Sequence, residues 1–89
     1  MEVTYDPIKD AANKAKHGVS LALADRLEWD SALIWIDNRK DYGEIRQSAL
    51  VLHGNRLYFI AFVDRIDTRR IISLRKANER EVRRYVANS

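Results

Sequence analysis

The chain contains no cysteine among its 89 residues, which excludes a disulfide scaffold, a thiolate metal site and a cysteine nucleophile. No apolar run approaches the ~18 residues needed to cross a bilayer. Residues 1–6 lack the basic and apolar regions of a secretory signal. The sequence also has no linker, no repeat and no low-complexity segment. We therefore expect one domain over residues 1–89, in the cytoplasm and without contact to a membrane.

Motifs for several common chemistries are missing as well. The sequence has no glycine-rich phosphate loop and no G-x-S-x-G motif, which disfavours ATP, nicotinamide and serine-hydrolase chemistry. No histidine–carboxylate cluster has the spacing of metal ligands. We therefore predict that the protein uses neither a metal ion nor a cofactor.

Positive charge is concentrated in the second half of the chain. Residues 1–45 carry six Lys and Arg against nine Asp and Glu, a balance of −3. Residues 46–89 carry ten against four, a balance of +6, and nine of those ten are arginine. Arginine favours bidentate contacts with phosphate and stacking on bases. Charge alone leaves nucleic acid and an acidic protein as equally open partners.

Capping signals predict two helices near the N-terminus. Asp6 is a natural N-cap before a proline, and Gly18 is a natural C-cap, so the first helix is expected over residues 7–17. Ser20 can cap a second, largely apolar helix over residues 21–28.

The rest of the chain reads as a sheet closed by one more helix. Strands are predicted at residues 32–36, 44–53, 57–63 and 70–75. Asn78 and Glu81 form an N-x-x-E capping box that opens a helix over residues 79–87. Short connections between consecutive strands favour an antiparallel meander. The predicted fold is α+β with the order ααββββα: two N-terminal helices, a four-stranded antiparallel sheet and a C-terminal helix.

The most informative stretch is the predicted strand at residues 70–75 with Arg69 before it. Isoleucines lie between arginines here, and Arg69 and Arg70 are consecutive, so at least one arginine should point to each face of the sheet. The strand fixes the backbone of an arginine in a sheet, and its guanidinium group presents several N–H donors in one plane. Such a residue suits the binding of a phosphate.

Several segments carry a family resemblance. They are Tyr5-Asp6-Pro7 with Asn13, Lys16-His17-Gly18-Val19-Ser20, Asp41-Tyr42-Gly43-Glu44-Ile45-Arg46, and Arg70-Ile71-Ile72-Ser73-Leu74-Arg75-Lys76-Ala77-Asn78 followed by Glu81-Val82-Arg83-Arg84-Tyr85. In this order they resemble the BrnT family of type II toxin–antitoxin toxins, within the RelE-like group of small ribonucleases. The similarity covers nearly the whole chain.

The resemblance implies an endoribonuclease toxin with a RelE-like fold that cleaves RNA and inhibits translation. It also implies a BrnA-type antitoxin as partner. Such antitoxins are usually ribbon-helix-helix DNA-binding proteins that neutralise the toxin and repress the shared operon. Operator DNA would then be contacted only through the antitoxin.

RNA supplies its own nucleophile, the 2′-hydroxyl, which attacks the adjacent phosphorus and expels the 5′-oxygen. A metal-free enzyme needs a proton acceptor, donors for the charge on the phosphorane and an acid for the leaving oxygen. Arginine can supply the donors but rarely gives up a proton. We predict a phosphate clamp of Arg46, Arg65 and Arg75, with Arg70 close behind. A surface salt bridge is the alternative for each of them.

Two residues are candidates for the base, and each has a structural alternative. Glu44 lies two residues before Arg46 and can instead orient that side chain. His17 is the other candidate because histidine is a common acid–base residue, but its position also suits the C-terminal end of a helix dipole. The predicted RNA-binding residues are Arg70, Lys40, Lys76 and Tyr85. Core packing is the alternative for Tyr85, and pairing with Asp37 or Asp41 is the alternative for Arg39 and Lys40.

Two other functions fit the same composition. One is a non-catalytic basic module that binds RNA or an acidic protein, and the other is an inactive toxin-like protein that only corepresses with its antitoxin. Salt-sensitive RNA binding without cleavage products would favour the first. The ordered motifs together with the arginine-rich second half favour the ribonuclease.

Overall fold

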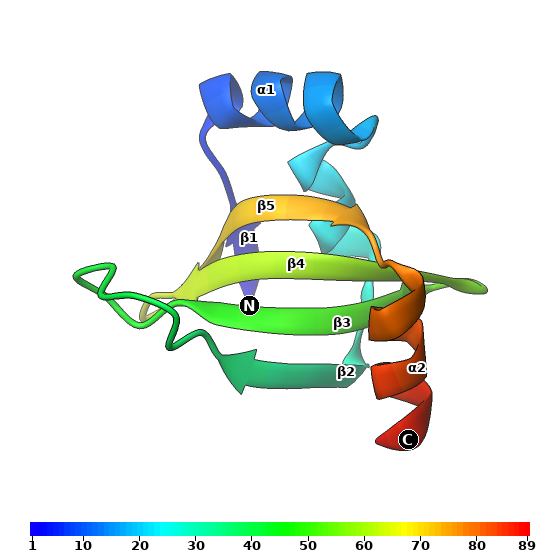
Figure 1. Cartoon of the computed structure of the whole chain (residues 1–89). Coiled ribbons are helices and arrows are strands. Elements are labelled where there is room, and N and C mark those ends of the chain that lie inside the picture. The colour runs from blue at the N-terminus through cyan, green and yellow to red at the C-terminus, as the bar shows by residue number, and fades with distance from the viewer.

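A five-stranded sheet forms the centre of the molecule, and the computed structural model describes all 89 residues (Figure 1). Its strands are β1 (Glu2–Thr4), β2 (Glu28–Ile36), β3 (Gln47–His53), β4 (Arg56–Asp64) and β5 (Thr68–Lys76). They lie in the order β1-β5-β4-β3-β2, with β1 parallel to β5 and the other neighbours antiparallel. The helices are α1 (Pro7–His17), a 3₁₀ helix (Leu21–Arg26) and α2 (Glu79–Ala87). No helix has the length and apolar character needed to span a bilayer.

The predicted fold is wrong in its second helix. Residues 21–26 form a 3₁₀ helix, and Ser20 caps it by accepting a hydrogen bond from the Ala22 amide at 3.1 Å. Leu21, Ala24 and Leu27 are buried at a spacing of three residues, which matches three residues per turn. This spacing is also compatible with one face of an α-helix, so the apolar pattern alone did not distinguish a 3₁₀ helix from an α-helix. The helices predicted at 7–17 and 79–87 are confirmed, with their caps.

The predicted four-stranded antiparallel sheet is also wrong, because β1 adds a fifth, parallel strand at the edge. Val3 pairs with Arg69 and packs on the core. Three residues are too few to show an alternating pattern, and their parallel partner lies far along the chain. The other strand bounds shift too. β2 begins four residues before the predicted strand because a register break between Glu28 and Leu33 hides the alternation, and β3 begins three residues later than predicted.

The two faces of the sheet have different roles. The face under α1 and the 3₁₀ helix holds the core, in which Phe62, Ile60 and Leu74 are fully buried. Arg69 lies on this face, with its guanidinium over the Trp29 ring at 4.4 Å. The opposite face carries Arg75 over the ring of Phe59. The predicted distribution of arginines to both faces is therefore confirmed.

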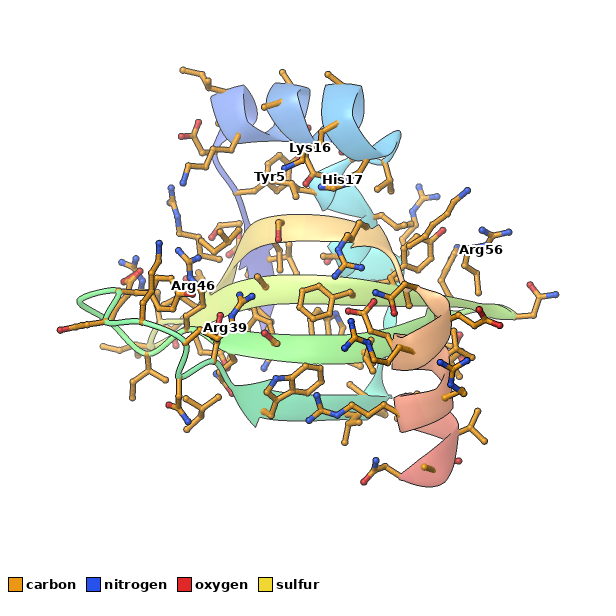
Figure 2. All side chains as sticks on the ribbon, in the orientation of Figure 1. Tyr5, Lys16, His17, Arg39, Arg46 and Arg56 are labelled. Carbon is orange, nitrogen blue, oxygen red and sulfur yellow. The ribbon has the colours of Figure 1, made fainter.

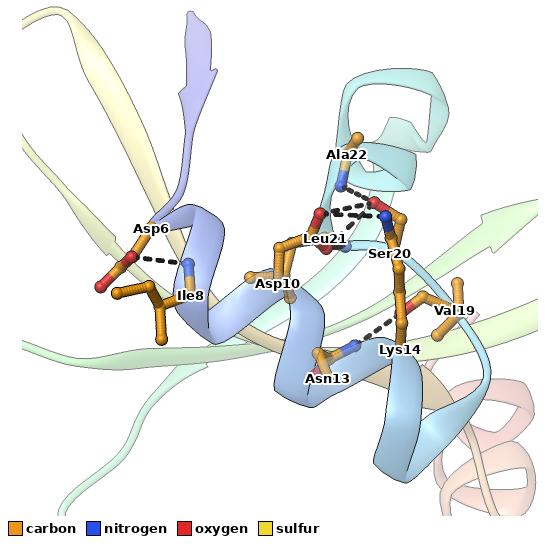
Figure 3. Close-up of polar contacts among 9 residues, drawn as sticks. All are labelled: Asp6, Ile8, Asp10, Asn13, Lys14, Val19, Ser20, Leu21 and Ala22. Carbon is orange, nitrogen blue, oxygen red and sulfur yellow. Dashed lines mark hydrogen bonds and ion pairs between the residues drawn. The ribbon is translucent and has the colours of Figure 1, made fainter.

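Buried polar side chains fix α1 over the edge of the sheet. Asn13 donates to the carbonyl of Leu74 at 2.8 Å and accepts from its amide at 3.2 Å. It thus satisfies the edge of β5 where β1 no longer pairs with it. Asp10 accepts from the Leu21 amide at 2.7 Å and from the Ser20 hydroxyl at 3.0 Å (Figure 3). The bond from the Leu21 amide lowers the pKa of Asp10.

Candidate functional site

A row of small side chains crosses the face of the sheet opposite α1. Ser48 pairs with Ala61, and Ala61 pairs with Ser73, so the three stand side by side on β3, β4 and β5. Trp35 of β2 pairs with Ser48 and ends the row. The neighbouring rows hold larger residues. Ser48, Ala61 and Ser73 therefore form a row of small residues between rows of larger ones, called the trough below, in which Ser48 is 3% and Ala61 7% exposed.

A hollow of about 510 Å³ opens at the Trp35 end of the trough. It is lined by Trp35, Ile36, Asp37, Asn38, Arg39, Ser48, Phe59, Arg75 and Glu81. The segment before β3 and the helix α2 flank this face at its two ends (Figure 1). The hollow is large enough to take a segment of a polymer and is lined by cations as well as by aromatic rings.

Arginines flank the trough on both sides. Arg70 pairs with Val63 in one neighbouring row, and Arg75 pairs with Phe59 in the other. Arg46 immediately precedes β3, two residues before Ser48, so the strand alternation directs it to the same face. Figure 2 shows Arg46 and Arg39 together at the end of the sheet nearest the connecting segment. Three of the four arginines predicted for the clamp thus share one face.

Two of the predicted clamp arginines are paired with carboxylates. Arg75 makes a bidentate pair with Glu81 at 2.8 and 2.9 Å. Partial burial raises the pKa of Glu81, but the hydrogen bonds from Arg75 and from the Asn78 amide outweigh it, so the net shift is downward. Arg65 pairs with Glu44 at 3.1 Å on an exposed rim. The positive charge of this face is thus partly neutralised within the protein.

Arg46 and Arg70 have no carboxylate partner in the structure. The guanidinium of Arg46 lies 3.9 Å from the centre of the Tyr42 ring. Its Nε is shielded from solvent and has no hydrogen-bond partner. Unpartnered buried donors are uncommon in native structures. The terminal nitrogens of both arginines make no hydrogen bond or ion pair within the protein, so they are free to bind an external anion.

Asp37 organises the segment that carries these groups. Its carboxylate is 6% exposed and accepts from the Arg39 side chain at 2.9 and 2.8 Å, and from the Tyr42 hydroxyl at 3.0 Å. These bonds, led by the one from the Arg39 side chain, hold the pKa of Asp37 far below its usual range. The alternative considered for Arg39, pairing with Asp37, is confirmed. The sequence alone did not show that Asp37 also holds Tyr42.

His17 lies at the β5 end of the trough. A groove of about 220 Å³ between α1 and β5 is lined by Lys16, His17 and Ser73, among others. Because Ser73 also belongs to the trough floor, the groove and the trough meet at this residue. Lys16 and His17 project from α1 on the side that faces β5 (Figure 2). The fold thus brings a titratable imidazole close to the arginine-flanked row.

The other predicted binding residues lie farther from the trough. The Tyr85 hydroxyl donates to the Ser31 carbonyl at 2.9 Å, which anchors α2 to β2. Lys76 pairs with Tyr58, a core residue, and so lies on the α1 face. Lys40 is exposed, with its Nζ 5.2 Å from the centre of the Tyr42 ring. Of these three, Lys40 lines a hollow together with Arg39 and Arg46.

A comparison with protein families identifies the family to which this chain belongs. The family model described as "Ribonuclease toxin, BrnT, of type II toxin-antitoxin system" matches residues 5–81, which are 77 of the 89 residues. The chain belongs to the BrnT family. This confirms the resemblance seen in the sequence. No curated protein matches the chain. As a BrnT ribonuclease toxin of a type II system, the protein has a protein antitoxin as partner and RNA as substrate.

Proposed function

We propose that this BrnT protein is an endoribonuclease that cleaves RNA by attack of the 2′-hydroxyl, without a metal ion, and inhibits translation by destroying messages. The observation that carries the proposal is the trough floored by Ser48, Ala61 and Ser73. On one side stand Arg46 and Arg70, which have no carboxylate partner, and on the other stands Arg75, which is paired with Glu81. Small floor residues let a phosphodiester approach the sheet, and the guanidinium groups offer donors on both sides.

In this proposal, Arg70 stabilises the phosphorane oxygens from one side of the trough, and Arg75 does so from the other. Arg75 must share its fork with the phosphate, because Glu81 already occupies two of its donors. Preorganised donors of this kind act where charge develops in the transition state. Arg65 and Glu44 neutralise one another on the rim, so they fit a role in shaping the entrance rather than in the chemistry.

His17 is the proposed proton acceptor for the 2′-hydroxyl. It borders the groove that shares Ser73 with the trough, and imidazole is a common general base in enzymes. Glu44, the other candidate, accepts a hydrogen bond from Arg65 at 3.1 Å, so its carboxylate is already paired with a cation. The proposal therefore assigns the base to α1 and the charge stabilisation to the sheet.

A BrnA-type antitoxin of the ribbon-helix-helix class is the proposed partner, with operator DNA contacted through it. Covering the arginine-flanked trough is the simplest way for such a protein to block RNA. Co-purification of the pair and loss of RNA cleavage on mixing would support this assignment. Cleavage that continues in a stable complex would contradict it.

The test of the chemistry uses purified protein and a short labelled RNA in EDTA. We expect cleavage to persist in EDTA and to leave a 2′,3′-cyclic phosphate. Arg70→Ala should lower the rate about 10²–10³-fold, since one donor to the developing charge is lost. Arg56→Ala removes the same charge at the far end of β4 (Figure 2) and should change little. Cleavage that requires a divalent ion, or products without the cyclic phosphate, would refute the mechanism.

A further inference from the structure

A second hollow lies beside the trough, in the segment between β2 and β3. It measures about 370 Å³ and is lined by Arg39, Lys40, Tyr42 and Arg46, called the loop subsite below. Three of its four residues are cations. The nearby carboxylates are engaged elsewhere: Asp37 accepts from Arg39, Asp41 accepts from the Gly43 amide and Glu44 pairs with Arg65. Lys40 and Arg46 are left without an opposing charge.

The state of Arg46 indicates that the loop subsite is built for an anion. Its guanidinium donates no hydrogen bond within the protein, and its Nε is closed off from water without a partner. The Tyr42 ring supports it at 3.9 Å, and the Tyr42 hydroxyl is tied to Asp37 at 3.0 Å. The side chain is thus held in place by a fixed ring while its donors lack an acceptor. The shielded Nε cannot reach a ligand, so an acceptor from outside the chain would be bound by the terminal nitrogens of the guanidinium.

We propose that the loop subsite binds the RNA phosphate next to the scissile one. The proposal rests on the proposed function, because the scissile phosphate is placed in the trough. Arg39 lines both the loop subsite and the hollow at the Trp35 end of the trough, so the two spaces adjoin. A phosphate fits better than a base, since the Tyr42 ring is already covered by the Arg46 guanidinium. The subsite would extend the recognised RNA beyond a single phosphodiester.

The experiment measures equilibrium binding of dinucleotides with a 2′-O-methyl group, which lack the nucleophile and cannot be cleaved. Three ligands are compared: one without a terminal phosphate, one with a 5′-phosphate and one with a 3′-phosphate. We expect one phosphorylated form to bind about tenfold more tightly than the unphosphorylated one, from one added charge-assisted contact. Whether the 5′-phosphate or the 3′-phosphate tightens binding shows in which direction the RNA runs across the sheet.

Substitutions then test which residues produce the tighter binding of the phosphorylated ligand. In Lys40→Ala, the ratio of the two affinities should fall towards one, and the dependence of log K on log salt should weaken by about 0.7 for the lost phosphate contact on a single strand. Lys40 is exposed, so this variant keeps the fold. Arg46→Lys keeps the charge but not the fork, and it should lose part of the gain. Arg56→Ala is the matched control and should keep the full ratio.

The outcomes separate the two proposals. A ratio of one for both phosphorylated forms in the unmodified protein overturns the loop subsite, even if RNA is cleaved as proposed. An equal loss in Arg56→Ala and Lys40→Ala also overturns it, because the effect would then be one of net charge. A gain that depends on Lys40, in a protein that cleaves no RNA, supports the loop subsite and refutes the proposed chemistry.

Discussion

Replacing Glu81 with glutamine should make the protein bind RNA more tightly while making it slightly less stable. Glu81 pairs with Arg75 through both carboxylate oxygens at 2.8 and 2.9 Å. It also accepts from the Asn78 amide at 2.9 Å in the capping box of α2. Glutamine supports a capping box as well. The substitution therefore removes a negative charge from the trough and leaves the start of the helix intact.

The size of the effect follows from the geometry. A phosphate bound to Arg75 would lie roughly 5 Å from the Glu81 carboxylate, because both contact the same guanidinium. The repulsion of two unit charges at that separation is about 1–3 kcal/mol, between bulk water and the surface of a protein. We expect Glu81→Gln to bind RNA about tenfold more tightly, near the lower end of that range. The lost ion pair should cost about 1 kcal/mol of stability, since both side chains are partly exposed.

The sign of the pH dependence is also determined. The pKa of Glu81 is lower in the folded protein than its ordinary value of 4.5. Its contribution to stability is therefore fully present above about 4.5 and is lost as the pH falls through the folded value. The stability difference between the original protein and Glu81→Gln should be constant near neutral pH and should shrink in acid.

The assay combines binding of an uncleavable 2′-O-methyl oligonucleotide with unfolding in urea. Glu79→Gln is the matched control, because Glu79 is on the same helix and lies 3.8 Å from Arg83, but its side chain is 90% exposed and forms no ion pair with Arg75. Equal or weaker RNA binding by Glu81→Gln would refute the placement of phosphate on Arg75. Loss of cleavage at unchanged binding would assign the proton acceptor to Glu81 instead of His17.

Two further predictions concern the parts that hold the site in place. Asn13→Ala removes three hydrogen bonds, two of them buried, between α1 and its neighbours and should lower the free energy of unfolding by about 3 kcal/mol in urea titrations; an equal loss in the exposed control Lys9→Ala would contradict this. Asp37→Asn should lower stability by about 1 kcal/mol at pH 7, by weakening the bonds from Arg39 and Tyr42. Because the pKa of Asp37 is lowered by folding, thermal melts should show this difference disappearing only in strong acid. A difference that is largest in acid would refute the ionised state.

Local signals were sufficient for the elements whose ends are marked by side chains. Asp6 and Gly18 bound α1, and Gly18 has a φ of 74°, a left-handed conformation that glycine adopts readily. Asn78 and Glu81 likewise mark α2. β1 could not be found this way, since its pairing with β5 depends on residues more than sixty positions away. The 3₁₀ helix was missed because its apolar spacing also fits an α-helix.

The residues of the candidate site could be selected from the sequence by their type, but their layout could not be predicted. The arginines could be selected by type and position, and three of the four predicted for the clamp share a face. Ser48, Ala61 and Ser73 carry no signature of their own, because only the register of three strands aligns them. That register contains a break between Ala61 and Phe62, which alternation in the sequence does not reveal. The pairing of Arg75 with Glu81 depends on the turn from β5 into α2.

The floor of the trough and the helix α2 beside it are held in place by different forces. The two parts should therefore respond differently to salt. The floor belongs to a sheet whose other face is packed with fully buried apolar residues. The helix α2 buries no residue completely. It is held by the Glu81–Arg75 pair, the Arg84 guanidinium 3.9 Å from the centre of the Trp35 ring, and the Tyr85 hydrogen bond. Salt screens charge contacts at the surface but not apolar burial. Raising the ionic strength should therefore loosen α2 and weaken RNA contacts together, while the sheet beneath them remains unchanged.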